Sequence, residues 1–410
     1  MSGSDNVWKR RWLLVIAGGL IMGAALGIRH VQGLFLQPVT FDRGWTREAF
    51  GMALALQNLL WGVAQPFTGM IADRFGSVRV LLAGALVYAL GLFVMAQATT
   101  TGVFTFGDGL LIGIGLSGTA FGTVYGALSR LFPVERRSWA LGVAGAVGGL
   151  GQFAMVPAAQ GLINGVGWVS AVIVLAVVMI LLSPLAAFLR DNQVAPEPSQ
   201  ANQSISEAVR EAFGHRGFWL LNLGFVACGF QLAFIAGHMP AYLLDKGLGA
   251  KEASVALALI ALANVVGTYL CGYLGGFLRR KYVLSVLYLV RSAAMVLFVA
   301  LPLTPLSVYV FSFVMGLIWL GTVPLTTGIV SQVFGVRYIT TLFGFVFFGH
   351  QLGGFFGAWL GGYVFDVTKS YDLVWFGSIA LGVIAALLHW PIDDKAVVRT
   401  GPVATAGQAA

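Results

Sequence analysis

The sequence predicts an all-α membrane protein with twelve transmembrane helices in two six-helix pseudo-repeats. Of its 410 residues, 58% are hydrophobic and 10% are charged, which is more apolar material than the core of a soluble domain needs. Apolar runs of about 20 residues, the length that crosses a bilayer, alternate with short polar turns. Two short motifs also recur in the second half of the chain. Together these observations indicate a duplicated helical membrane protein.

Twelve apolar runs qualify as membrane-spanning helices. They are expected at residues 12–38, 49–73, 78–98, 103–130, 138–164, 167–189, 217–243, 252–277, 281–301, 305–332, 338–364 and 371–391. The basic stretch Trp8–Arg11 is similar to the start of a signal peptide, but the following run is too long and many more spans come after it. We therefore expect a retained first helix.

The distribution of basic residues predicts the orientation in the membrane. If the loops alternate between two sides, one side is poor in Lys and Arg. Its basic residues are Arg43, Arg47, Lys246, Lys251 and Lys369. Apart from Arg29 and Arg291, which fall inside spans, the rest of the 24 Lys and Arg residues lie on the other side. Because basic loops stay in the cytoplasm, we expect both termini there, in the inner membrane of a bacterium.

One long polar segment divides the chain. The expected parts are an N-terminal six-helix half at 1–190, a cytoplasmic linker at 191–216, a C-terminal six-helix half at 217–394 and a disordered tail at 395–410. Within the linker, Ser204 and Glu207 have the spacing of a capping box, which predicts a short amphipathic helix on the membrane surface. The alternative is a plain disordered linker.

A charged turn between the second and third spans is the most specific local signal, and we call it the latch motif. It comprises Gly69, Asp73, Arg74, Gly76 and Arg79. The two glycines allow close helix approach and a sharp turn. Asp73 is expected either at a neighbouring helix N-terminus or paired with Arg74 or Arg79. We therefore assign a gating role to this motif.

Echoes of two motifs support the duplication. Gly69 recurs as Gly272, about 203 residues later, but Gly276 replaces the aspartate of the latch motif. The stretch from Phe132 to Gly142 recurs from Phe334 at about the same offset. Two independent echoes at nearly one offset indicate two related halves.

Charged and polar residues inside the spans are the candidates for a binding site. An arginine at a helix centre costs roughly 2.5–3.5 kcal/mol on insertion scales, so it needs a reason. Arg29 and His30 lie inside the first span, and at least one is expected to face an aqueous cavity; the alternative is snorkelling to the outer boundary. Arg291 is expected either to brace helices or to contact substrate. Asp108 is expected to begin a helix close to water; the alternative is a proton carrier.

Further polar residues complete the candidate substrate site, each with the alternative role of hydrogen bonding between helices. They are Gln57, Asn58, Tyr125, Gln152, Gln231, Asn264, Thr268, His350 and Gln351. His30 and His350 are the candidates for proton coupling because histidine titrates near neutral pH. Arg136 and Arg137 join the latch motif as candidate gating residues.

The sequence lacks the motifs that are typical of several other classes of function. The sequence has no phosphate-binding loop, no zinc-binding His-x-x-x-His helix and no nucleophile elbow. Cys228 and Cys271 both fall in spans and give neither a disulfide framework nor a metal site. The basic residues form no continuous face for nucleic acid. We expect no enzyme, no cofactor and no metal.

The latch motif resembles the loop signature of the major facilitator superfamily, and the chain as a whole looks like its monocarboxylate porter and oxalate:formate antiporter branch. The more specific marks are Arg29–Phe35, Arg130–Gly142 and Gly353–Asp366. The resemblance implies a basic residue near the substrate in the first helix, matched by His30, and one in the eleventh, matched by His350. The arginine of the eighth helix is missing, since Asn264 and Thr268 stand at the matching positions.

These features predict a secondary transporter of a small organic anion, in particular a monocarboxylate. We expect alternating access, coupling to a proton and a monomer in the lipid bilayer. The absent arginine leaves an alternative, an exporter of hydrophobic or aromatic compounds. A transporter-like receptor is a third class. The residues leave the direction of transport and the coupling ion open.

Overall fold

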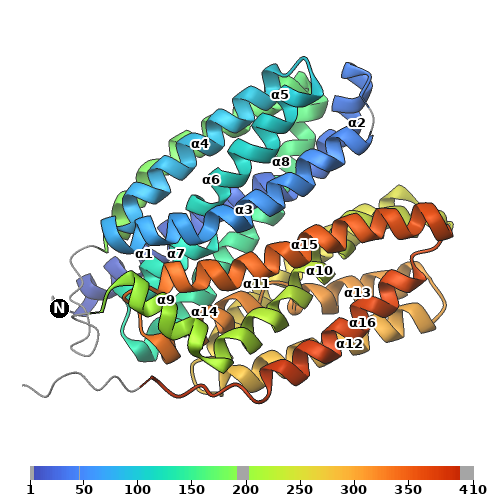
Figure 1. Ribbon diagram of the computed structural model, residues 1–410. Coiled ribbons are helices and arrows are strands. Elements are labelled where there is room, and N and C mark those ends of the chain that lie inside the picture. The colour runs from blue at the N-terminus through green and yellow to red at the C-terminus, as the bar shows by residue number, and fades with distance from the viewer. Residues whose placement is uncertain (1–3, 46, 192–202, 398–410) are drawn as a thin grey trace, which may run out of the picture.

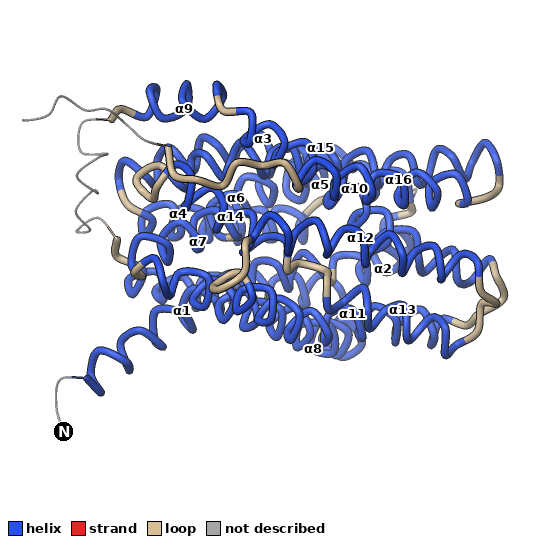
Figure 2. Tube along the Cα trace, turned by 90° about the horizontal axis from the view of Figure 1, so that it is seen from below, coloured by secondary structure: helices blue, strands red, loops and turns tan. Residues whose placement is uncertain are grey.

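The computed structural model describes residues 4–45, 47–191 and 203–397. The described part is helical, without a strand, and the long helices run side by side within each of two groups (Figures 1 and 2). Two groups of helices form the molecule, one from the first half of the chain and one from the second (Figure 1). This arrangement confirms the predicted all-helical class.

The first group contains the elements before the long polar segment. They are α1 (Ser4–His30), α2 (Gln32–Arg43), α3 (Arg47–Phe75), α4 (Ser77–Gln97), α5 (Thr101–Thr105), η1 (Phe106–Ile112), α6 (Gly113–Thr119), α7 (Phe121–Leu131), α8 (Val134–Leu182) and η2 (Ser183–Leu189). The second group follows it. Its elements are α9 (Ile205–Gly214), α10 (Arg216–Asp245), α11 (Ala250–Leu274), α12 (Arg280–Ala300), α13 (Pro305–Leu317), α14 (Thr322–Phe334), α15 (Ile339–Thr368) and α16 (Asp372–His389).

Twelve membrane crossings fit these elements. Within the described residues, ten helical stretches are long and apolar enough to cross a membrane. One of them, Val134–Leu189, is really two crossings, because Gly167 takes a φ of +79° inside α8 and bends the chain there. The 29-residue α3 adds another, since it extends about 44 Å at 1.5 Å per residue.

Three spans expected to be continuous are broken in the structure. The first, 12–38, is interrupted at Val31 between α1 and α2. The fourth, 103–130, contains the π-helix η1 and a second break at Ala120. The tenth, 305–332, is interrupted between α13 and α14. Hydropathy does not register such breaks, because the residues on both sides are apolar. Broken helices expose backbone groups in the membrane interior, where transporters place their sites.

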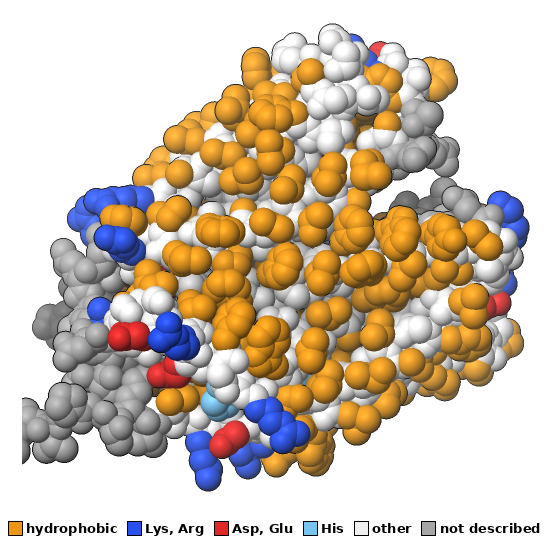
Figure 3. All heavy atoms as spheres, in the orientation of Figure 1, with side chains coloured by type: hydrophobic (Ala, Val, Ile, Leu, Met, Phe, Trp, Pro, Cys, Tyr) orange, Lys and Arg blue, Asp and Glu red, His pale blue; other side chains and the backbone are white. Residues whose placement is uncertain are grey.

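The surface of the molecule matches a bilayer environment. Large apolar side chains lie exposed along the outer helices, for example Leu86, Leu181 and Leu387. Figure 3 shows these side chains as a broad belt, with charged side chains gathered at the ends of the molecule. A soluble monomer rarely exposes so large an apolar surface. The chain is a multi-pass membrane protein.

The two groups meet at one end and part at the other. We call the first the latch end; it carries α9, the N-terminus and the α3–α4 and α11–α12 turns (Figure 1). We call the second the open end; it carries α2 and α5, and the halves part there in Figure 3. α3 packs on α15, and α8 packs on α11.

Glycines make these two contacts unusually close at the latch end. A Cβ added to Gly69 would lie 2.6 Å from the Thr340 carbonyl oxygen, and one added to Gly142 would lie 2.9 Å from the Gly272 Cα. At the open end, a Cβ on Gly33 or Gly161 would meet nothing within 4 Å. At these glycines the halves touch backbone to backbone at the latch end and not at the open end.

Gly272→Ala should disturb this closed contact. The new Cβ would lie 2.4 Å from the Gly142 Cα and 2.7 Å from the Ser138 carbonyl oxygen, where backbone has to move. Overpacking of this kind costs about 1–3 kcal/mol, so the melting temperature in detergent should fall by several degrees. Gly161→Ala is the matched control and should not lower the melting temperature, since its methyl group has open space and alanine favours helix. Equal melting temperatures for the two variants would contradict the close contact.

The linker contains one described helix, α9. The Ser204 side chain accepts a hydrogen bond from the Glu207 backbone N–H, and the Glu207 carboxylate accepts one from the Ser204 backbone N–H. The capping box indicated by the sequence is therefore formed, and the Ser204 backbone hydrogen bond holds the pKa of Glu207 below its ordinary value. Phe213 packs edge-on against Phe345 of α15. The expected membrane-surface position stays a prediction, and most of the predicted tail lies outside the described residues.

Candidate functional site

Arg29 lies at the break of the first span, in the last turn of α1. Its guanidinium donates a hydrogen bond to the Asn58 side-chain oxygen of α3 and lies 5.5 Å from the centre of the Trp61 ring. Its Nε is buried without a hydrogen-bond partner among the described residues. A cation at a helix C-terminus is favoured by the helix dipole, but one neutral partner does not balance a charge in the membrane. His30 lies beside it, half-buried at the same break.

Asp108 corrects the sequence interpretation, because it is fully buried rather than close to water. It sits in η1, and its Oδ1 accepts hydrogen bonds from Gln32 at 2.6 Å and from Gln57 at 3.1 Å. Its Oδ2 is buried and has no hydrogen-bond partner among the described residues. The expectation failed because a position near the end of an apolar run does not reveal the α2 and α3 side chains that fold over it. Gln57, predicted for the substrate site, donates to this carboxylate, and its role toward substrate stays a prediction.

His350 and Gln351 bring α15 to the same centre. The His350 ring stacks on Phe347 with ring centres 5.2 Å apart, and its Nδ1 lies 2.9 Å from the Gln351 side-chain oxygen. Gln351 donates to the Asn58 carbonyl oxygen at 3.4 Å, which joins the two halves. Trp61 packs on Phe347 with ring centres 4.9 Å apart. The structure thus brings Arg29, Asn58 and the α15 pair together.

A second group of predicted residues lies where α8 meets α11. Asn264 accepts hydrogen bonds from the Thr268 hydroxyl at 2.9 Å and from the Leu320 backbone N–H at 3.1 Å. Tyr125 is fully buried, and both its hydroxyl and the Thr268 side chain approach Gly145 of α8. The tyrosine hydroxyl has no hydrogen-bond partner among the described residues. A further predicted residue, Gln152, is buried on α8.

Gln231 lies with Arg291 inside the second half. Its side-chain oxygen accepts from Arg291 at 3.2 Å, and its Nε2 donates to the Ser378 carbonyl oxygen at 2.8 Å. Arg291 is fully buried and also donates to the carbonyl oxygens of Ile318 and Trp319 at the α13–α14 break. These contacts are those of a bracing residue, which takes up backbone oxygens freed by a broken helix. Gln231 is committed to this bracing cluster rather than to the centre that contains Arg29.

The latch motif closes the latch end through Asp73. Its carboxylate accepts hydrogen bonds from the Thr341 backbone N–H at 2.7 Å and from the Thr340 backbone N–H at 3.3 Å, at the N-terminus of α15. It also forms an ion pair of 2.6 Å with Arg130 of α7, which is paired in turn with Asp191 at 2.6 Å. The sequence offered two alternatives for Asp73, a neighbouring helix N-terminus or a pair with Arg74 or Arg79. The helix N-terminus is confirmed.

The predicted arginine partners of Asp73 are wrong. Arg74 and Arg79 are exposed, and the Arg74 guanidinium lies 5.3 Å from the Phe75 ring centre. Both side chains are exposed at the turn, whereas the Asp73 carboxylate is bonded to α15. Arg137 donates to the Phe132 carbonyl oxygen at 3.1 Å, and Arg136 is half-buried beside it in the first turn of α8.

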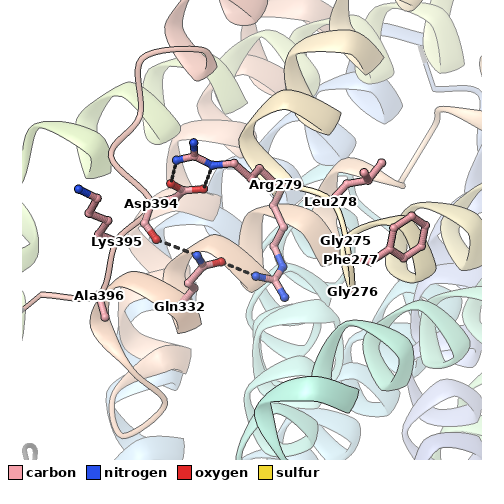
Figure 4. A pocket seen from close by; sticks show the side chains of 10 residues that line it. Gly275, Gly276, Phe277, Leu278, Arg279, Gln332, Asp394, Lys395 and Ala396 are labelled. Atoms are coloured by element: carbon pink, nitrogen blue, oxygen red, sulfur yellow. Dashed lines mark hydrogen bonds and ion pairs between the residues drawn. The ribbon is translucent and has the colours of Figure 1, made fainter.

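A second group of contacts, which we call the second latch, joins α8 to the α11–α12 turn. Here the charged side chain that reaches across to the other half is an arginine rather than an aspartate. Arg280 reaches across to the Ser138 hydroxyl at 2.8 Å and also donates to the Gln332 side-chain oxygen. Gln332 donates to the Asp394 carbonyl oxygen at 2.8 Å, and Arg279 is paired with the Asp394 carboxylate (Figure 4). A surface cavity of about 510 Å³ opens among these side chains, away from the centre that contains Arg29. The Arg279 hydrogen bond holds the pKa of Asp394 below its ordinary value.

Corresponding residues build the two latches. Their sequence positions differ by about 203: Asp73 with Gly276, Arg130 with Gln332, and Asp191 with Asp394. Arg130 and Asp191 were not among the predicted site residues. The sequence does contain a signal for Asp191. This residue is separated from Asp394 by the same offset that separates Gly69 from Gly272.

The fold and the polar centre define a class, the secondary transporters, in which two helical halves enclose a site near the middle of the membrane. The chain belongs to the Major Facilitator Superfamily, whose family model matches residues 15–358. No group of three potential metal ligands occurs among the described residues.

Curated relatives cover nearly the whole chain. "Uncharacterized MFS-type transporter YcxA" of Bacillus subtilis is 25% identical, over 94% of this chain and 96% of that protein. "Monocarboxylate transporter 11" of Homo sapiens is 27% identical, over 97% and 85%. "Oxalate:formate antiporter" of Oxalobacter formigenes is 24% identical, over 97% and 94%.

Among solved structures, the outward conformation of the transporter FucP superposes with a TM-score of 0.71 at 16% identity. The match covers 92% of this chain and 97% of that one. The proton:xylose symporter XylE gives a TM-score of 0.68 at 12% identity, over 95% and 96%. At such identities these matches show the fold alone.

Proposed function

We propose that this transporter carries a small organic anion, in particular a monocarboxylate, together with a proton. The observation that supports the proposal is Arg29, a cation inside the membrane span with one neutral side-chain partner and a buried Nε without one. A buried charge is costly unless it is paired, and a substrate carboxylate would give Arg29 a counter-charge in direct contact. Several relatives are named for monocarboxylates or oxalate and formate.

The rest of the proposed site surrounds Arg29 from both halves. Asn58 and Gln351 offer amide groups to the polar end of a substrate, and Trp61 and Phe347 form an apolar wall. On the other side of the centre, Asn264 and Thr268 bond to each other and leave no cation at the family's usual place. Arg29 would therefore hold the carboxylate in this chain.

We propose that the latch end faces the cytoplasm. The basic residues concentrate at the turns of that end, and basic loops stay inside. The protein would then lie in a bacterial inner membrane with both termini inside, and the conformation described here would be closed inward and open outward. Rocking of the two halves would expose the site alternately. His30 and His350 remain candidate proton carriers, and the protein would act as a monomer.

An export function for hydrophobic or aromatic compounds is the second candidate. Aromatic rings crowd the centre, where Phe225 and Phe347 both contact the His350 ring and Phe121 contacts Phe347. Such a wall would suit an uncharged aromatic substrate. The two candidates differ in whether the substrate must carry a negative charge.

Thermal stabilisation of the purified protein separates the candidates. A ligand at 100 times its Kd stabilises the folded state by about 2.7 kcal/mol. We expect lactate or pyruvate to raise the melting temperature, and lactamide, a neutral analogue of lactate, to have no effect. Uptake of the stabilising acid into proteoliposomes should then be saturable. Stabilisation by aromatic amines but by no carboxylate would favour the exporter instead.

A further inference from the structure

Asp108 is a buried carboxylate that the proposed substrate site does not use. Its Oδ1 accepts two amide hydrogen bonds, from Gln32 and Gln57, while Oδ2 has no partner among the described residues. Charged carboxylates normally satisfy both oxygens when they are buried. The free oxygen, fully enclosed in the first half, is positioned to receive a proton.

Among the described residues, the cation that acts on Asp108 is Arg29. The charged and titratable groups that act on Asp108 are Arg29 of α1 and Tyr88 of α4, and the Tyr88 hydroxyl donates to the Ala25 carbonyl oxygen at 2.8 Å. Gln32 and Gln57, its neighbours from α2 and α3, are neutral amides. Arg29 and Asp108 are not paired directly, although each acts on the other electrostatically. Asp108 is thus a counter-charge to Arg29 without contacting it.

We propose that Asp108 is the proton-binding group of the transport cycle, and that its protonation makes Arg29 available to the organic anion. This inference rests on the proposed function. When Asp108 is ionised, it balances Arg29, and an arriving anion would add a second negative charge. When Asp108 takes up one proton, the negative charge disappears and the anion replaces it. One proton and one monovalent anion then enter together, with no net change of charge in the site.

The geometry favours Asp108 over the two histidines for this task. A proton on His30 would add a positive charge beside Arg29 in the same helix turn. The His350 ring lies between Phe347 and Phe225, and its Nδ1 is engaged with Gln351. Its Nε2 has no hydrogen-bond partner among the described residues, so a proton there would also add a positive charge near Arg29. Asp108 alone among these groups loses its charge when it binds a proton. If the proton is to remove a negative charge that the anion then replaces, the group that binds the proton must be a carboxylate.

Proton uptake upon anion binding tests the proposal directly. Purified protein in weakly buffered solution with a pH indicator should take up protons when lactate or pyruvate is added at neutral pH. The affinity for the anion should rise at least about tenfold as the pH falls, the usual size of coupling between two sites. Asp108→Asn should bind the anion without proton uptake and with an affinity that no longer depends on pH. Asp245→Asn, which alters an exposed carboxylate at the end of α10, should behave as the unchanged protein.

The outcomes separate this inference from the proposed function. If the unchanged protein binds no carboxylate, the proposed function fails and this inference with it. If it binds one but Asp108→Asn still takes up protons, while His350→Gln or His30→Gln does not, Asp108 is not the proton site. Should Asp108→Asn fail to fold, infrared difference spectra of the unchanged protein and of Asp108→Glu provide the test. A protonated-carboxyl band must appear on anion binding and shift in the glutamate variant; its absence overturns the proposal.

Discussion

Arg29→Gln should abolish uptake of a carboxylate substrate. The change removes the one cation of the centre formed by α1, α3 and α15, while glutamine can still donate to Asn58. An anion entering that site would then be buried without a counter-charge, which costs several kcal/mol. A loss of this size lowers affinity at least about a hundredfold. Uptake into proteoliposomes and thermal stabilisation by the substrate should both disappear.

Arg291→Gln serves as the matched comparison for Arg29→Gln. Arg291 donates to Gln231, to the Cys228 sulfur and to two carbonyl oxygens at the α13–α14 break, so its loss should lower the folded yield and leave substrate binding intact in the protein that folds. The reverse pattern would relocate the anion site. If Arg29→Gln transports normally while Arg291→Gln folds well and binds nothing, the ninth span carries the substrate and the first does not.

Asp73→Asn should slow transport with little effect on equilibrium affinity for substrate. The carboxylate holds the N-terminus of α15 through Thr340 and Thr341, and asparagine cannot replace its charge at a helix N-terminus. It also balances Arg130, and breaking a buried ion pair costs about 3–5 kcal/mol, less here because Asp191 remains. The closed latch should thus be weakened, and turnover should fall at least about tenfold.

Kinetic and binding data together test the role of Asp73. Initial uptake rates give the turnover, and substrate-dependent melting gives the affinity. Asp245→Asn again provides the control, because it changes an exposed carboxylate at the end of α10. A large loss of affinity with normal turnover would mean that Asp73 acts on the substrate site and not on the latch.

The sequence predicts the helical class and the latch because both depend on local patterns. Apolar runs of bilayer length follow from composition along the chain, and the glycines around Asp73 stand close together in sequence. The placement of Asp73 at a helix N-terminus was one of two alternatives, and the structure decides between them. Arg74 and Arg79 were the wrong partners because proximity in sequence does not imply proximity across a turn.

The candidate site depends on contacts between distant segments, and there the sequence is less informative. Asp108 meets Gln32 and Gln57 only because the first and fourth spans are broken and packed around α3. Apolar runs with interruptions have the same mean hydropathy as continuous ones. Arg291 could be placed within a span but not against carbonyl oxygens at a break. Such pairings need the packed helices.

The direct backbone contact between Gly142 and Gly272 affects how well the closed end excludes water and protons. A protein that couples two solutes to a gradient must not let protons or water pass between its halves, because each leaked charge dissipates about 2.3 kcal/mol per 100 mV of membrane potential. Side chains that meet tip to tip can leave gaps wide enough for a file of water. Two backbones as close as those of Gly142 and Gly272 leave no room for a water molecule between them at that point. If the proposed proton coupling holds, the glycines that let the halves close would also limit proton leakage through the closed end.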